Sequence, residues 1–262
     1  MNVFTERLVG SSALLITTTL LAACGVGEAV KDVAGEVSAA TTLTKALPNA
    51  GTPVFHYRIK GGVQPLAGVV DAPNKSMTTE INEKIPDAGL TLSMKFLVIG
   101  DQAWTRISFD GAKSGSGLPK LPKKWMKLDS GKLSADSAED LTYQGETDPG
   151  FVSSLLLASA DLKETGERTY AGTTDLTRST EAEIVESEVL TALGEKAKAV
   201  PLELTLDAEG RITTALVEIP AAGKAGAATY EVVYDQYGSA TPVTAPADGV
   251  AATEDVYELL NG

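Results

Sequence analysis

The sequence predicts an α+β domain in which a single antiparallel β-sheet carries helices on one face. Between residues 51 and 237, apolar and polar residues alternate with a period of two in several short segments, which is the pattern of strands with one buried face. Segments with helical periodicity or helix start signals lie among and after these strands. Neither a repeat nor a linker interrupts residues 51–262, so we expect one domain there.

The chain begins with the layout of a lipoprotein signal peptide. Arg7 precedes an apolar run from Leu8 to Ala23, and the run closes with Leu21-Ala22-Ala23-Cys24. These four residues resemble the lipobox, at which bacterial lipoprotein maturation diacylates the cysteine and cleaves just before it. We therefore assign residues 1–23 as a signal peptide that is cleaved between Ala23 and Cys24. An uncleaved N-terminal anchor is the alternative, although the run is short and rich in Thr and Ser for a transmembrane helix.

Cys24 is the only cysteine of the chain, and acylation explains a sole cysteine at this position better than packing does. A single cysteine also excludes a disulfide within the chain and a thiolate metal cluster. The two chains of a diacylglycerol anchor a protein firmly where one chain would not, and an N-acyl group would add to them. Cys24 is therefore the predicted lipid attachment site, which places the protein on the extracytoplasmic face of the cell membrane.

The composition limits the partners of the exported part. Hydrophobic residues make up 43% of the chain, enough for a core, and the formal net charge is −13. This acidic balance argues against nucleic acid, which selects basic surfaces. It also argues against a body that lies flat on anionic lipid, so the anchor must hold the protein at the membrane. We expect a monomer.

Residues 24–50 are predicted to be the lipidated N-terminus and a tether. Apolar residues recur at helical spacing between Glu28 and Leu47, and Pro48 ends the pattern. The helix is either a spacer near the membrane or packs on the domain. We expect its second half to pack and its start to act as a flexible tether.

The clearest local prediction is a hairpin between Thr91–Ile99 and Gln102–Phe109. Gly100-Asp101 forms a two-residue loop with Gly first, as a type II′ turn prefers. This register places Phe96 opposite Thr105 and Met94 opposite Ile107. One face of the hairpin is then almost wholly apolar and the other mostly polar, and a slip of one residue would exchange them.

Further strands and helices follow from the same signals. The other predicted strands are Phe55–Ile59, Leu66–Val70, Met77–Ile85, Trp125–Leu128, Thr169–Leu176, Leu202–Leu206, Ile212–Leu216 and Tyr230–Tyr237. Gly210 is expected at a bulge of the 202–216 hairpin. Asp148-Pro149 predicts a helix with Asp148 as cap and proline at the first position. Thr180 and Glu183 predict a capping box for a helix that carries Val185, Val189 and Leu193, and Thr253–Leu260 predicts a closing helix.

Several of these segments resemble one protein family. The segments are the lipobox, Ile99-Gly100-Asp101-Gln102-Ala103-Trp104, Tyr170-Ala171-Gly172-Thr173-Thr174-Asp175, Pro201-Leu202-Glu203-Leu204, Asp207-Ala208-Glu209-Gly210-Arg211-Ile212 and Tyr234-Asp235-Gln236-Tyr237-Gly238. Together they are similar to the LppX/LprG family of actinobacterial lipoproteins, over nearly the whole mature chain. Because these motifs are turns and strand ends, they specify fold more than chemistry.

The resemblance implies a LolA/LolB-like fold for residues 51–262. In that fold, a curved antiparallel sheet, or half-barrel, wraps its concave face over helices and encloses an apolar cavity. Some members of the family bind lipids or lipoglycans and move them across the cell envelope. The cavity residues expected here are Phe55, Tyr57, Leu92, Met94, Phe96, Val98, Ile107 and Phe109.

Patterns for catalysis are absent from the sequence. The one histidine, His56, lies on the polar side of a predicted strand, and no nucleophile motif or phosphate-binding glycine loop occurs. The acidic stretch from Asp136 to Asp148 lacks the spacing of a calcium loop and is expected to be solvated. We therefore expect neither an enzyme nor a cofactor or metal.

Two features leave alternatives open. The first is a group of four lysines around Trp125, namely Lys120, Lys123, Lys124 and Lys127. These lysines either meet anionic head groups of a membrane or protect an edge strand from pairing, and we favour the second interpretation. The apolar hairpin face is either plain core or, with flexible Met94 and Met77, an adaptable lipid pocket.

The predicted function is an anchored, non-enzymatic protein that binds or carries an apolar lipid or lipoglycan between sheet and helices. Desolvation of acyl chains would drive binding, and the site would accept many different acyl chains because it makes few directed hydrogen bonds. The alternative is an envelope interaction or sensing lipoprotein with a filled core and no ligand.

Overall fold

The computed structural model describes residues 27–112, 117–182 and 184–261. Ala23 and Cys24 fall outside these residues, so the signal peptide and lipid attachment stay predictions. Helix α1 (Gly27–Ala46) confirms the expected helix before Pro48. Its second half packs on the domain as expected, since Leu43 is fully buried and the helix lies against β7 and α3.

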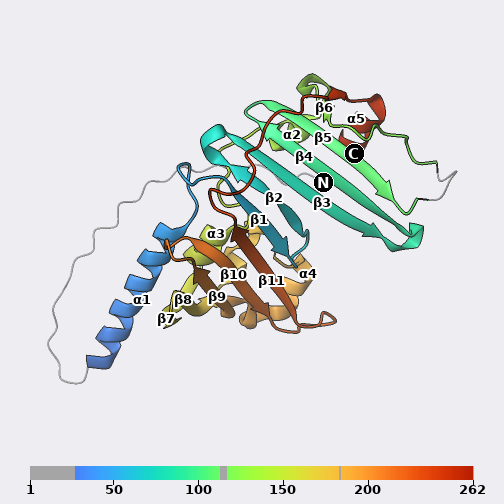
Figure 1. The fold of residues 1–262 in the computed structure, drawn as a ribbon. Helices are drawn as coiled ribbons and strands as arrows, with labels where there is room; N and C mark the ends of the chain where they lie inside the picture. The colour runs from blue at the N-terminus through green and yellow to red at the C-terminus, as the bar shows by residue number, and fades with distance from the viewer. Residues whose placement is uncertain (1–26, 113–116, 183, 262) are drawn as a thin grey trace.

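One open sheet of twelve strands forms the body of the protein (Figure 1), in the order β12-β6-β5-β4-β3-β2-β1-β11-β10-β9-β8-β7. The strands are β1 (Phe55–Lys60), β2 (Leu66–Asp71), β3 (Ser76–Ile85), β4 (Leu90–Ile99), β5 (Gln102–Asp110), β6 (Met126–Lys127), β7 (Ser159–Gly166), β8 (Thr169–Thr174), β9 (Val200–Leu206), β10 (Ile212–Ile219), β11 (Ala228–Asp235) and β12 (Val250–Ala251). Neighbouring strands are antiparallel, except that β12 runs parallel to β6. The predicted α+β class with one mostly antiparallel sheet is confirmed.

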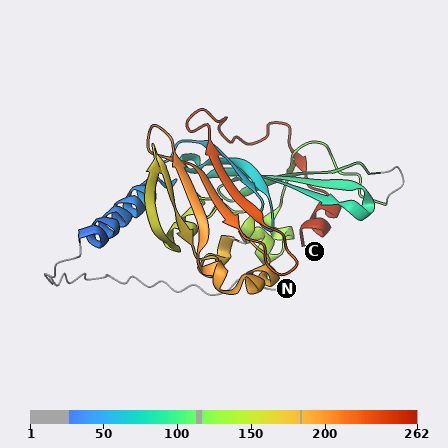
Figure 2. The ribbon, with the colours of Figure 1, turned by 90° about the horizontal axis from the view of Figure 1, so that it is seen from below.

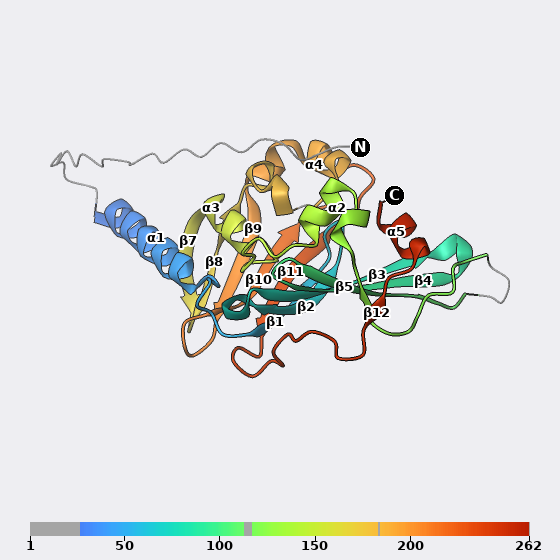
Figure 3. The ribbon, with the colours of Figure 1, turned by 90° about the horizontal axis from the view of Figure 1, so that it is seen from above.

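Short helices lie on one side of this sheet. They are α2 (Ala135–Asp140), α3 (Val152–Leu157), α4 (Ser187–Leu193) and α5 (Glu254–Asn261). The long loop from β11 to β12 crosses the opposite side, as the views from below (Figure 2) and from above (Figure 3) both show. We call the side with the helices the inner face and the other side the outer face.

The β4–β5 hairpin has the predicted register. Phe96 lies opposite Thr105, Met94 opposite Ile107 and Leu97 opposite Trp104. Gly100 has φ +58°, the left-handed conformation that a type II′ turn needs at its first central position. The alternation of apolar and polar residues therefore sufficed to fix which side chains face inward.

The inner face carries two separate hydrophobic cores. The larger core joins β1 and β8–β11 to α1, α3 and α4, and its largest fully buried side chains include Phe55, Leu43, Tyr234, Leu155 and Leu204. The smaller core joins β4–β6 to α5 through Ile107, Met126, Leu128, Val256 and Tyr257, and Leu133 and Leu141 on either side of α2 pack against it. The helices thus cover the two ends of the sheet as separate groups, and β2 and β3 lie between them.

Helix α3 begins later than the sequence predicts. Phe151, with φ +51°, precedes the first helical residue Val152, so Pro149 is not at the first position. Asp148 still caps the helix, because its carboxylate accepts hydrogen bonds from Val152 N at 3.1 Å and Ser153 N at 2.7 Å. Asp148 was predicted correctly as the capping residue. The helix begins three residues later than expected, because a turn lies between Asp148 and Val152.

Two further predictions in this half of the chain are wrong, and one strand was not predicted. Helix α4 begins at Ser187, so no capping box by Thr180 starts it, and Thr180 lies in a 3-10 turn. Strand β7, which begins at Ser159, was not predicted, and its mostly exposed pattern reflects its position at the sheet edge. An exposed edge strand lacks the alternation that identifies a strand in sequence. The bulge of the β9–β10 hairpin lies between Ile212 and Thr214 and not at Gly210.

Strand β6 is not an edge strand, which corrects the interpretation of the lysine patch that we favoured. β6 pairs with β5 on one side and with β12 on the other. Lys127 donates a hydrogen bond to Gln102 Oε1 at 2.9 Å, and Lys124 lies 3.5 Å from an oxygen of Asp248. These two lysines therefore bind groups of the protein itself.

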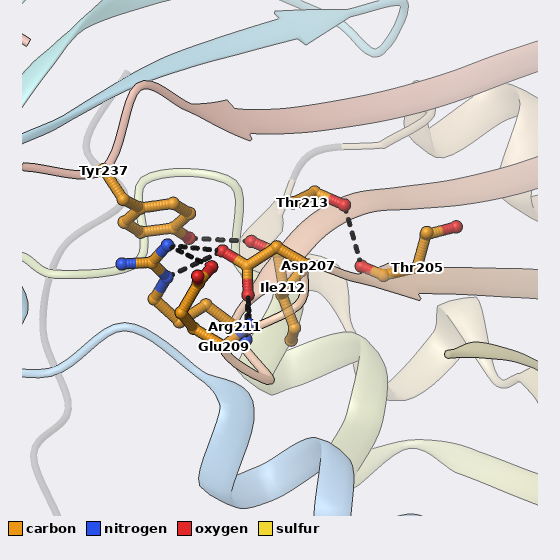
Figure 4. A network of polar contacts seen from close by, with 7 residues as sticks. All are labelled: Thr205, Asp207, Glu209, Arg211, Ile212, Thr213 and Tyr237. Atoms are coloured by element: carbon orange, nitrogen blue, oxygen red, sulfur yellow. Dashed lines mark hydrogen bonds and ion pairs between the residues drawn. The ribbon is translucent and has the colours of Figure 1, made fainter. Parts of the chain in front are cut away.

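A polar network closes the β9–β10 hairpin (Figure 4). Asp207 accepts hydrogen bonds from Arg211 N at 2.8 Å and Arg211 Nε at 2.7 Å, and the guanidinium lies 4.6 Å from the centre of the Tyr237 ring. Tyr237 donates a hydrogen bond from its hydroxyl to Ile212 O at 2.7 Å. The network fixes the chain after β11 onto this hairpin.

The Asp207→Asn variant is expected to lose stability at neutral pH and to match the wild type in acid. Burial by itself raises the pKa of the Asp207 carboxyl, but the hydrogen bonds and charge of Arg211 outweigh it and hold this pKa below 3.8. A lowered folded-state pKa stabilises the fold above the unfolded pKa of about 3.9 and loses this effect as pH falls through the folded value. Urea unfolding at pH 7 and near pH 2 measures the difference, and an equal loss at both values would contradict the prediction.

Candidate functional site

A cavity of about 290 Å³ lies on the inner face, beneath α2 and α5. Its apolar lining comes from the sheet and both helices: Met77, Ile81, Phe96, Val98, Leu141 and Leu260. Thr79, Ser137 and Asp140 complete the lining. This volume lies just below the roughly 300–1,000 Å³ of small-molecule sites, so the cavity fits one apolar chain better than a bulky ligand.

The cavity exists because the two cores leave the middle of the sheet partly uncovered. Met77, Thr79 and Ile81 of β3 point to the inner face, opposite Val98, Phe96 and Met94 of β4. Five of these six side chains are only half-buried, whereas their counterparts on β1 and β9–β11 are fully buried. Apolar side chains that face helices without full burial leave space for a ligand.

The helices above the cavity are held together by polar contacts at its edge. Ser137 Oγ donates a hydrogen bond to Leu260 O at 2.9 Å, and Ser134 N donates one to Asn261 Oδ1 at 2.8 Å. Lys132 forms an ion pair with Glu254 at the start of α5. Because these bonds join α2 to α5, the two helices form one cover over β3 and β4.

The polar groups of the lining are compatible with an apolar site. Thr79 Oγ1 accepts a hydrogen bond from the Tyr57 hydroxyl at 2.9 Å, so it already has a partner within the protein. Burial raises the pKa of Tyr57 to about 12, which keeps this hydroxyl a donor. Burial raises the pKa of the Asp140 carboxyl, and the nearby charges of Glu139 and Asp136 raise it further. Ionisation of Asp140 is thus less favourable than that of a free aspartate.

The structure separates the eight predicted cavity residues into three groups. Phe96 and Val98 line the cavity. Four others share the inner face and contribute to the smaller core, namely Leu92, Met94, Ile107 and Phe109. Phe55 and Tyr57 belong to the larger core, where the Phe55 ring packs 5.3 Å from that of Tyr234 between centroids. Phe55 therefore fills space and does not line this cavity.

Sequence reasoning missed the part that α2 contributes. Ser134 caps helix α2, because its hydroxyl accepts a hydrogen bond from Ser137 N, and Leu141, directly after the helix, lines the cavity. The signal was a serine cap before an acidic first turn. This stretch was instead expected to be a solvated loop because of its carboxylates.

The described residues hold neither a metal cluster nor a membrane span. No three His, Cys, Asp or Glu side chains among them are grouped as metal ligands. None of the helices in the described part of the chain has the length and hydropathy to cross a bilayer.

Comparisons with known proteins give no family for the chain. No family model and no curated protein matches it. Among solved structures, it is similar to a porin-like protein from Bacteroides uniformis at 10% sequence identity and a TM-score of 0.17, over 72% of this chain and 98% of that chain. A TM-score this low carries no argument about fold or function.

Proposed function

We propose that the chain is an anchored extracytoplasmic lipoprotein that binds or carries an apolar lipid, or the acyl part of a lipoglycan, in the cavity between β3, β4 and helices α2 and α5. The observation that carries this proposal is the cavity of about 290 Å³ with six apolar side chains in its lining. Transfer of acyl methylenes from water to such a lining is worth about 0.8 kcal/mol each.

The proposal includes the LppX/LprG resemblance and its LolA/LolB-like fold. It is supported by one open sheet with four short helices on a single side. In this proposal the sheet is a half-barrel, the helices occupy its concave face, and Cys24 attaches the protein to the membrane. No side chain of the cavity is then needed for anchoring, which leaves the cavity free for cargo.

The ligand test uses a soluble version that begins after Cys24. We expect native mass spectrometry of this protein, incubated with palmitate, to show a complex with one bound fatty acid. Lipid extraction of the untreated protein should recover lipid from the expression host. If neither experiment finds a bound lipid, the carrier proposal is wrong, and the alternative of an interaction or sensing lipoprotein gains support from the larger core, whose side chains are buried against one another.

The Phe96→Trp variant tests whether the space beside Phe96 is empty. Phe96 is half-buried and lines the cavity, so the larger ring should enter it and change the free energy of unfolding by less than about 1 kcal/mol. In a filled core the same change costs about 1–3 kcal/mol. Urea unfolding of the soluble protein distinguishes the two outcomes.

A further inference from the structure

We propose that the outer face holds a second binding site, a polar groove that takes a neutral saccharide. The groove has a volume of about 400 Å³ and crosses strands β11, β1, β2, β3 and β4. Its polar lining includes His56, Arg58, Asp235, Gln236, Glu80 and Lys95, and Trp125 also lines it. The groove and the lipid cavity lie on opposite faces of the sheet and share Thr79 and Phe96 in their linings.

The first argument is hydrogen-bonding capacity that the protein leaves unused. His56 of β1 lies directly opposite Asp235 of β11, yet the ring Nδ1 is 3.8 Å from the carboxylate. An Arg58 nitrogen is 3.6 Å from the other carboxylate oxygen. Both distances exceed a hydrogen bond. The three side chains are between 38% and 51% exposed. Asp235 Oδ1 is itself buried without a hydrogen-bond partner, so the groups available to a ligand are Asp235 Oδ2, the Arg58 guanidinium and the His56 ring.

The second argument is the mixture of donors and acceptors. The Arg58 guanidinium supplies up to five N–H donors, and the Asp235 carboxylate supplies only acceptors. A ligand that satisfies both must accept from one and donate to the other, which hydroxyl groups do. A simple anion would meet Arg58 but would be repelled by Asp235 and Glu80. The chemistry therefore favours a polyol over phosphate.

The third argument is the aromatic side chain at the other end of the groove. Trp125 is half-buried, and the guanidinium of Arg106 lies 4.7 Å from the centre of its ring. This contact fixes the indole against the sheet. Aromatic rings beside charged hydrogen-bonding groups suit a sugar, which has apolar C–H faces and polar hydroxyls. Lys95, held by Glu80 at 2.6 Å, closes the same end.

A larger cavity is a weaker candidate. It has a volume of about 630 Å³ near β6 and β12. Its polar side chains already bind one another, since Lys127 donates to Gln102 and Lys132 pairs with Glu254. The outer groove differs because its charged groups at β1 and β11 have only loose ion pairs.

The test is a titration of the full chain, purified in a zwitterionic detergent, with neutral trisaccharides of glucose, mannose or galactose. The chain has two tryptophans, and Trp104 is almost fully buried outside the groove lining. A Trp104→Phe background therefore makes Trp125 the only indole reporter. We expect saturable fluorescence change with a Kd at or below about 1 mM for at least one trisaccharide.

Matched variants locate the binding. Asp235→Ala and Arg58→Ala are each expected to weaken it by tenfold or more. Glu231→Ala is the control, because it removes a carboxylate from the same strand and face, where it is paired with Lys60 at 2.6 Å outside the groove. Its affinity should stay within twofold of the background protein, and thermal unfolding should show that all three variants are folded.

Three results would overturn the proposal. They are no saturable binding of any trisaccharide, equal binding by the Asp235→Ala and Arg58→Ala variants, and competition in which inorganic phosphate displaces the sugar from the groove. The proposal does not depend on lipid binding, since the groove lies on the opposite side of the sheet from the apolar cavity.

Discussion

The Asp148→Ala variant is expected to lose about 3–5 kcal/mol of unfolding free energy, the largest effect of a single polar substitution that we predict. Asp148 caps α3 through Val152 N and Ser153 N and also accepts a hydrogen bond from the Tyr234 hydroxyl. Removal of a helix cap costs about 0.5–2 kcal/mol. A buried polar group left without a partner adds about 1–3 kcal/mol, more where it paired with a charge.

The tyrosine side of this contact makes the loss severe. Tyr234 is fully buried, and its hydroxyl also accepts a hydrogen bond from Gly150 N at 3.0 Å. Burial raises the pKa of Tyr234 far above its usual value, and the charge of Asp148 raises it further, so the phenol stays protonated and donates. Without the Asp148 carboxylate, the buried Tyr234 hydroxyl loses its acceptor, and no water can reach it to accept the hydrogen bond instead.

Urea unfolding of three variants tests the contact. Asp175→Ala is the control, because Asp175 caps only a 3-10 turn through Thr177, and it should cost about 1 kcal/mol. Tyr234→Phe should fall between the two, since it removes one hydroxyl and keeps the helix cap. If Asp148→Ala costs no more than the Asp175 control, the buried contact does not stabilise the fold. If Asp148→Ala does not fold, Asp148→Asn and Tyr234→Phe still decide the comparison.

The second large effect concerns the cavity. The Ile81→Trp variant is expected to lower affinity for an acyl probe such as palmitate by tenfold or more, about 1.4 kcal/mol of binding free energy. Ile81 lines the cavity from β3 and is half-buried. An indole there would occupy the volume that the chain needs, at little cost to folding because the space is open.

The control for this variant changes the same sheet on its other side. Thr91 of β4 faces outward, because it alternates with Leu92 of the smaller core. Thr91→Trp adds the same ring away from the cavity, so its affinity for palmitate should match the wild type. Competition with a fluorescent fatty acid gives both affinities. Equal affinity of the two variants would show that the acyl chain does not bind in this cavity.

Much of the inner face could be predicted from the sequence. The period-two pattern placed Phe55 on the buried face of β1, and it placed Phe96 and Ile107 on one face of the β4–β5 hairpin with the correct partners. A strand has only two faces, so alternation is enough to assign each side chain once the turn is known. Strand β7 and helix α2 were missed, and helix α4 begins later than predicted. These segments are short and mostly exposed, so they lack the long apolar pattern that identifies a strand or a helix in sequence.

What the sequence by itself determined is the direction of each side chain, inward or outward, along the long strands. It also predicts an anchor at Cys24, which lies outside the described residues. Only the tertiary structure decided where space remains: Phe55 fills a core, whereas Phe96 borders a cavity, although both have the same pattern. The physical reason is that burial depends on which helices cover a strand, and this covering is set by contacts such as Ser137 with Leu260 between segments far apart in the chain.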